Sequence, residues 1–229
     1  MSRNLKCLAL IMLMASLAGT AAHASGGSSS PSPTAQTPQP EASPEEQARQ
    51  HYNQGLYYRD KAWKLEKQLE AAATDKQRDK LTKKIAKNYR MAMGEFEDAL
   101  RNAPDMYQAS SSLGYTLRKT GDYKQSLEAY DHALSIEPGY AEAIEYRAET
   151  YLALGQLEDA KNAYVQLFGS DRARSNELLM AMQMWLGQHS GGQSEVPQSI
   201  LENFAEWVDE RAEIAGMTTP VSELRDKSW

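Results

Sequence analysis

The residue types that most often carry enzyme chemistry or bind metals are sparse in this sequence. It has one cysteine, Cys7, and the histidines of its main part, His51, His132 and His189, lie far apart. They lack the short His/Cys spacings that are typical of zinc sites. A Gly-rich phosphate loop, a G-x-S-x-G motif and an H-E-x-x-H motif are also missing. We therefore expect no catalytic residues, no cofactor, no metal and no small-molecule substrate.

Charge is more informative than these reactive residues. The chain of 229 residues has a formal net charge of -6, which argues against a nucleic-acid partner. Glu142, Glu145 and Glu149 follow one another at i, i+3 and i+7, so they share one helix face. Segment 59–90 holds 11 Lys and Arg against five acids, a charge of +6.

We call segment 59–90 the basic arm. Its charge can attract an anionic partner or surface, and the alternative is a solvated hairpin whose lysines only maintain solubility. The lysines that would meet such a partner are Lys61, Lys64, Lys67, Lys76, Lys80, Lys83, Lys84 and Lys87.

The beginning of the chain has the layout of a secretory signal peptide. A basic start precedes an apolar run at 7–17, and Ala22-His23-Ala24 provides a cleavage motif. The run is too short to span a bilayer, and Thr20 stands where a lipoprotein has its acylated cysteine. We expect residues 1–24 to be removed, with retention as an anchor as the alternative. The mature chain would carry no cysteine and be exported, to a bacterial periplasm.

Residues 25–43 are rich in Ser, Pro and Gly, which predicts a disordered tether. A Pro-rich ligand for an SH3-like partner is the alternative. The tether ends where a helix is expected to begin, because Ser43 and Glu46 have the spacing of a capping box and Pro44 suits the first helical position.

The basic arm has the pattern of two long helices. Apolar residues recur at helical spacing on both sides of one plausible reversal at 71–75, and these residues are Leu56, Trp63, Leu65 and Leu69, then Leu81, Ile85, Tyr89 and Ala92. We predict two antiparallel helices of about 27 residues, each roughly 40 Å long at 1.5 Å per residue. They would begin within the folded part of the chain and project beyond it.

A period of about 34 residues runs through the middle of the chain. Pro104 and Pro138 lie one period apart, and each follows an Ala-Leu pair. Small and aromatic residues recur in matching columns, which are Ala92, Phe96 and Ala99, then Ser126, Tyr130 and Ala133, then Ala160, Tyr164 and Leu167. The preceding helices align at Gly55, Gly114 and Ala148, where small residues allow close packing.

This pattern resembles the tetratricopeptide repeat, a helix pair marked by W-x2-L-G-x2-Y, A-x3-F and a final proline. The third repeat departs from it, with Arg147 in place of Leu and Arg172 in place of Pro. The resemblance implies an all-α, right-handed superhelical stack of three helix pairs, the first extended into the arm, and a degenerate capping pair. The implied bounds are 44–106, 107–140, 141–174 and 175–215, with a loose tail at 216–229.

The fourth pair is rich in methionine at 175–188. We expect this strip to be core, with an adaptable partner surface as the alternative.

In tetratricopeptide repeats the first helices line a concave groove that receives a peptide or partner segment. The resemblance implies a groove that changes from aromatic and cationic to acidic along its length. Its residues would be Arg49, Tyr52, Leu56, Arg59 and Asp60, then Gln108, Ser111, Tyr115, Arg118 and Lys119, then Glu142, Glu145, Glu149 and Leu152.

Relatives that hold the C-terminal carboxylate of heat-shock chaperones use Lys, Asn and Arg at five groove positions. These positions are here Tyr52, Leu56, Ser112, Glu142 and Tyr146, so that ligand is not expected. The sequence predicts a non-catalytic adaptor in a bacterial cell-envelope complex, with a protein or peptide partner in the groove. The alternative is attachment to an anionic envelope polymer or membrane surface through the basic arm.

Overall fold

The structure, a computed structural model, describes residues 42–189 and 196–217, all within the unit Glu41–Trp229. The predicted signal peptide, nearly all of the predicted tether and the predicted tail beyond residue 217 lie outside the described residues. The described part consists of eight helices without a strand, which confirms the predicted all-α class. None of these helices combines the length and the hydropathy needed to cross a bilayer.

The first two helices, α1 (Pro44–Glu70) and α2 (Asp75–Asn102), contain the basic arm. They have 27 and 28 residues, and the chain reverses between them where the sequence predicted it. The capping box is also confirmed: the Glu46 amide donates to the Ser43 hydroxyl at 3.2 Å, and the Ser43 amide donates to the Glu46 carboxylate at 3.0 Å. At the start of α2, the hydroxyl of Thr74 accepts from the Gln77 amide.

The next two pairs follow the predicted repeats and are α3 (Tyr107–Thr120) with α4 (Tyr123–Ile136), then α5 (Ala141–Ala153) with α6 (Leu157–Ser170). Helices α2 and α4 each end two residues before a proline, because proline disfavours helical backbone in the residue before it. Gly121 and Gly155 make the turns inside the pairs with φ of +88° and +69°, a conformation that favours glycine.

The last pair is α7 (Arg172–His189) with α8 (Gln198–Met217). Without a proline at 172, α7 begins three residues before the predicted bound at 175. Asp171 caps it, since its carboxylate accepts from the Arg174 amide at 3.0 Å. The methionine strip is core only in part: Met182 is buried, whereas Met180 and Met184 are 49% and 65% exposed.

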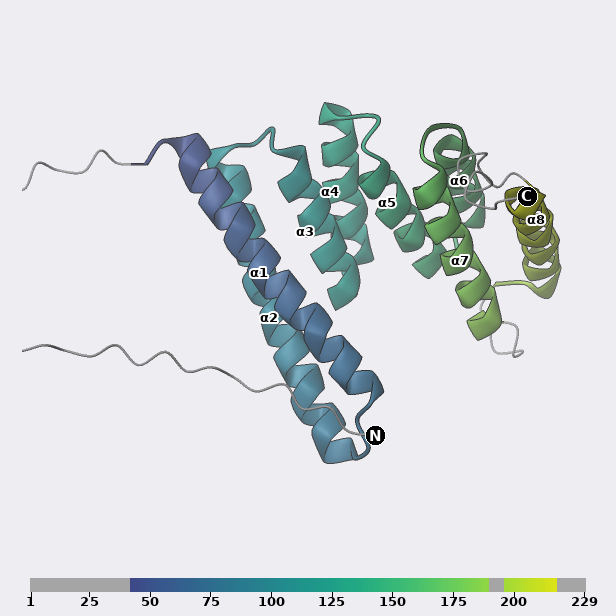
Figure 1. Cartoon of the computed structure of the whole chain (residues 1–229), viewed down its shortest axis with the longest axis horizontal. Helices are drawn as coiled ribbons and strands as arrows, with labels where there is room; N and C mark the ends of the chain where they lie inside the picture. Colours follow the sequence, from purple (N-terminus) through teal and green to yellow (C-terminus); the bar gives the residue numbers. More distant parts are fainter. Residues whose placement is uncertain (1–41, 190–195, 218–229) are drawn as a thin grey trace, which may run out of the picture. The chain divides into compact units, whose positions relative to one another are not determined.

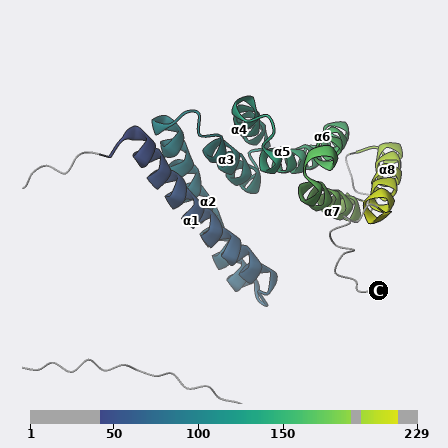
Figure 2. The same ribbon diagram turned by 45° about the horizontal axis from the view of Figure 1, so that its top comes forward.

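The first helices of successive pairs lie beside one another. Besides the contacts between helices adjacent in the chain, α1 contacts α3, α3 contacts α5 and α5 contacts α7 (Figure 1). The end of the α1–α2 pair around residues 70–75 projects beyond α3 and α4 in both views (Figures 1 and 2). This arrangement gives the four first helices a common face.

Within the first two pairs, an aromatic ring fills the space left by a glycine. Phe96 and Tyr130 have no exposed surface, and they pack on the backbone of Gly55 and Gly114 respectively. A hydrogen bond of 2.8 Å from the Ser126 hydroxyl to the Gly114 carbonyl adds a second link between α3 and α4. The columns aligned in the sequence are therefore the core of the repeats.

We predict that Gly114→Ala destabilises the fold by about 1–3 kcal/mol, because the new Cβ would lie 2.8 Å from the buried Tyr130 ring. Gly94→Ala, where no atom lies within 4 Å, is the matched control. It should stabilise α2 by about 0.5–1 kcal/mol through helix propensity. Urea denaturation of both variants measures the difference, and equal midpoints would contradict the packing argument.

Candidate functional site

A pocket of about 610 Å³ opens on the common face of the four first helices. It is lined by Trp63 of α1, by Tyr115, Arg118 and Lys119 of α3, by Glu145, Tyr146 and Glu149 of α5, and by Ala173, Arg174 and Glu177 of α7. Five of these residues, from Tyr115 to Glu149, are among those expected to line the groove. The structure therefore brings predicted groove residues of the second and third repeats to one place.

The three cations of this pocket are paired with glutamates of neighbouring first helices. Arg118 lies 2.5 Å from Glu149, which joins α3 to α5, and Arg174 lies 2.6 Å from Glu145, which joins α7 to α5. Lys119 lies 2.9 Å from Glu66 and joins α3 to α1.

The three glutamates at the predicted acidic end of the groove thus share two arginines, Arg118 and Arg174. Glu142 also has a cationic partner, because Arg174 lies 3.6 Å from it as well as beside Glu145. The acidic helix face found in the sequence is real, but arginines from α3 and α7 cover it.

Aromatic rings and guanidinium groups lie close together in the lining of the pocket. The rings of Tyr115 and Tyr146 have centroids 5.2 Å apart, and Arg118 lies 5.4 Å and 5.8 Å from them. Arg174 lies 5.7 Å from the Tyr146 ring. Burial raises the pKa of both phenols, so they stay neutral hydrogen-bond donors.

Glu145 is the most buried of these charged groups, with 4% of its surface exposed. Burial raises the pKa of its carboxyl, while the hydrogen bond and charge of Arg174 act in the opposite direction. The same partnership raises the pKa of the Arg174 guanidinium. We interpret this pair as a fixed link between α5 and α7 rather than as free charges.

The predicted residues of the first repeat lie apart from this pocket. Tyr52 is half-buried and packs against Phe96, with ring centroids 5.9 Å apart. Arg59 lies 2.9 Å from Asp60, on the same helix. Arg49 is exposed on α1, and Leu56 is half-buried.

Three predicted positions on α3 and α5 contribute little to an open surface. Gln108 is half-buried, and Ser111 is only 1% exposed, with a hydroxyl that has no hydrogen-bond partner within the described part of the chain. Leu152 was wrongly assigned to the groove. It is 3% exposed and belongs to a core cluster with Leu157 and Ala160, because its side of α5 faces α6.

Sequence reasoning missed five residues that line the pocket, which are Trp63, Tyr146, Ala173, Arg174 and Glu177. Trp63 follows Leu56 and Arg59 at i+7 and i+4, so helical periodicity already placed it on the groove face of α1. The family resemblance points to Tyr146 only as a clamp position. Arg174 and Glu177 were missed because the repeat pattern put 174 at the end of the third repeat, whereas both lie in the first turns of α7.

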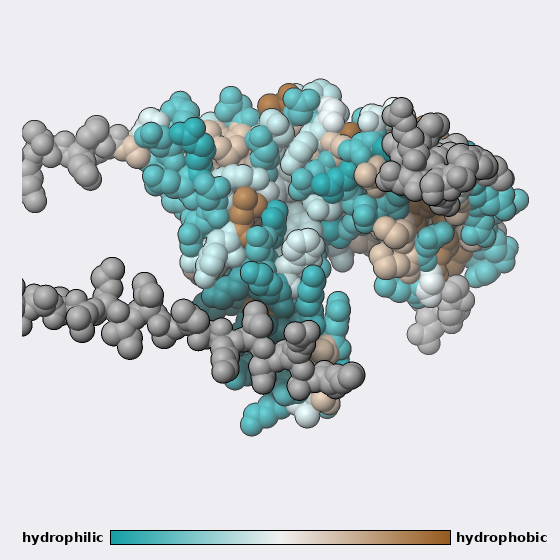
Figure 3. Space-filling model, in the orientation of Figure 1, coloured by the Kyte–Doolittle hydropathy of each residue, from teal (hydrophilic) through white to brown (hydrophobic). Residues whose placement is uncertain are grey.

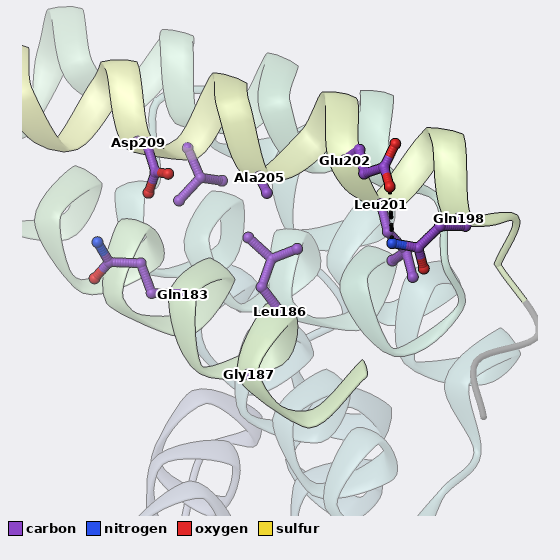
Figure 4. Close-up of a pocket in the computed structure, with 9 residues that line it drawn as sticks. Gln183, Leu186, Gly187, Gln198, Leu201, Glu202, Ala205 and Asp209 are labelled. Atoms are coloured by element: carbon purple, nitrogen blue, oxygen red, sulfur yellow. Dashed lines mark hydrogen bonds between the residues drawn. The ribbon is translucent and has the colours of Figure 1, made fainter. Parts of the chain in front are cut away.

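A second pocket of about 460 Å³ lies between the last two helices (Figure 4). Leu186, Leu201, Ala205 and Val208 make it largely apolar, and the Gln198 amide donates to Glu202 at 3.0 Å on its rim. A next helix pair would cover this kind of face in a longer array. The pocket therefore belongs to the end of the stack and not to the groove.

We predict that Arg174→Met destabilises the fold by roughly 2–4 kcal/mol near neutral pH, because it leaves the buried Glu145 carboxylate without its cation. The pKa of Glu145 then rises further, so the folded chain binds a proton more tightly than the unfolded chain. The lost stability should therefore return as the pH falls below that raised pKa. Urea midpoints at pH 5 and pH 8 measure the effect.

The double variant Arg174→Met, Glu145→Leu is the control, since it removes the unpaired charge. It should recover most of the stability at pH 8. A double variant no more stable than Arg174→Met would contradict this account.

Comparison with known proteins identifies the family of the repeat. No curated protein matches the sequence. Among solved structures, the first TPR of Spaghetti (RPAP3) bound to the HSP90 peptide SRMEEVD is 17% identical, with a TM-score of 0.41. The match covers 58% of this chain and 94% of that one. Residues 117–183 match the family model of the tetratricopeptide repeat. This match runs from the end of α3 into α7 and agrees with the tetratricopeptide repeat predicted for these helix pairs.

Proposed function

We propose that this chain is a non-catalytic adaptor that holds a segment of a partner protein in the groove of its first helices. Tetratricopeptide repeats build extended concave surfaces that serve for binding. The observation that carries the proposal is the pocket itself, to which all four first helices contribute side chains. A partner seated there touches every repeat at once.

The pocket favours a partner that brings apolar or aromatic groups. Trp63 is 52% exposed at its edge, and the rings of Tyr115 and Tyr146 supply further contact area. Arg118 and Arg174 already have carboxylate partners, so a partner's acids would have to compete with them. Groove binding should therefore depend only weakly on salt.

We also propose that the chain acts in a complex of the bacterial cell envelope. The support comes from the sequence, in which a basic start, the apolar run 7–17 and Ala22-His23-Ala24 form a signal peptide with a cleavage site before Ser25. Export would place the groove in the periplasm, where the absence of cysteine from the mature chain suits an oxidising compartment.

We predict that the photoreactive variant Trp63→p-benzoylphenylalanine forms a discrete crosslinked product in the native host. The control is Val165→p-benzoylphenylalanine, at a 60% exposed site on α6, the second helix of its pair. Mass spectrometry of the periplasmic fraction should find this crosslinked product for the Trp63 variant. It should also show that the mature chain begins at Ser25. Products of equal yield at both positions would exclude the groove as the binding site.

A second candidate function is attachment to an anionic polymer or membrane surface through the basic arm. The observation that favours it is that most cations of the arm have no acidic partner in the described part of the chain. In the described part of the chain, the ten Lys and Arg from 61 to 90 form no ion pair, in contrast to the paired cations of the pocket. Hydrophilic residues also predominate over the α1–α2 pair in Figure 3.

We predict that the chain cosediments with vesicles of phosphatidylglycerol and phosphatidylcholine but not with pure phosphatidylcholine. Each lysine near an anionic surface contributes about 1 kcal/mol. The quadruple variant Lys80→Gln, Lys83→Gln, Lys84→Gln, Lys87→Gln should therefore lose most of the binding, as should raising the salt. Binding that neither the variant nor salt reduces would argue against this function.

A further inference from the structure

We propose that His51, Glu95 and Asp98 form a binding site for a transition-metal ion, with Zn²⁺ as the best-suited ion. His51 lies near the start of α1, and the two acids lie in the last turns of α2. One ligand atom from each residue falls within a cluster whose members are all within 4.8 Å of one another. This site is separate from the groove and does not depend on its function.

The distances within the cluster indicate that its side chains need to move little to bind an ion. Nδ1 of His51 lies 2.8 Å from Oε2 of Glu95 and 4.0 Å from Oδ2 of Asp98. Tetrahedral zinc with bonds of about 2.0–2.2 Å places its ligand atoms about 3.4 Å apart. The observed separations bracket this value, so small side-chain rotations suffice.

The two helices supply the ligands from rigid positions. Glu95 and Asp98 are three residues apart in α2, so they project from the same helix face. Arg101 forms an ion pair with Oδ1 of Asp98, while Oδ2 is the oxygen nearer to His51. This outer contact orients the carboxylate in the manner of the hydrogen bonds that surround metal ligands.

The donor set and its exposure also fit a metal ion. An imidazole nitrogen with two carboxylates suits zinc, and three protein ligands leave a fourth position open. The side chains of His51, Glu95 and Asp98 are 37%, 24% and 33% exposed, which gives an ion access from solvent. The other described histidines have different surroundings: His132 contacts the Ser110 hydroxyl, and His189 contacts the Trp185 carbonyl.

The position of the site gives the ion a structural role. The turn at 71–74 already joins α1 and α2 at the projecting end of the arm, and the cluster lies at the opposite end of the same pair. Tyr52 and Phe96, the neighbours of His51 and Glu95, pack together across the two helices. A bound ion would therefore close the pair at its open end and fix the first helix of the groove.

The test uses the full chain, freed of metal with a chelator and then titrated with ZnCl₂. We expect one equivalent of Zn²⁺ to bind and raise Tm by about 5–10 °C at 100-fold its Kd, whereas MgCl₂ has no such effect. Co²⁺ should give the visible absorption of a four-coordinate site. His51→Gln and Glu95→Gln should abolish binding, and Glu97→Gln, at an exposed acid of the same helix, should retain it.

Glu95→Gln separates a metal site from a hydrogen-bonded link between the helices, because the amide can still bond to His51 but is a poor zinc ligand. If these substitutions lower Tm equally with and without Zn²⁺, the cluster is a hydrogen-bonded link only and the proposal is wrong. The same holds if Zn²⁺ shows no saturable binding, or if Glu95→Gln retains it.

Discussion

The packing of an aromatic ring on a glycine inside a helix pair is the constraint on which the rest of this structure depends. Phe96 on Gly55 and Tyr130 on Gly114 set how closely the two helices of each pair approach. Since a Cβ at either glycine would overlap the ring, helices packed this closely cannot accommodate a larger residue at these positions. The third pair has Ala148 and Tyr164 in the same columns, both buried, so a slightly larger residue is accommodated there.

Once the geometry of each helix pair is fixed, ion pairs between successive first helices hold the side chains of the groove in place. Lys119 with Glu66, Arg118 with Glu149 and Arg174 with Glu145 link α3 to α1, α3 to α5 and α7 to α5. These partners are partly or largely buried, where an unpaired charge would be costly. The groove therefore has defined side-chain positions before a partner arrives, which reduces the ordering that binding requires.

The sequence predicted the helices well because their signals are local. The capping box at Ser43, the prolines at 104 and 138 and the repeat period each fix a helix end or a packing column over a short stretch. The site was harder to predict. Glu142, Glu145 and Glu149 share one helix face, as the sequence predicted. Arg174, the partner of Glu142 and Glu145, lies two helices further along the chain, in a repeat whose start the missing proline obscured. Likewise, His51 and Glu95 are 44 residues apart, beyond any ligand spacing that a motif would reveal.

The surfaces of this chain differ more in whether their charges are paired than in how many charges they carry. The groove pairs its three cations with glutamates of neighbouring helices, while the arm keeps ten cations without ion pairs among the described residues. At the other end of the stack, α8 carries five acids against Arg211. An anionic surface would attract the arm and repel α8. Attachment through the arm would thus direct the last pair away from that surface, and the groove between them would remain open to a partner.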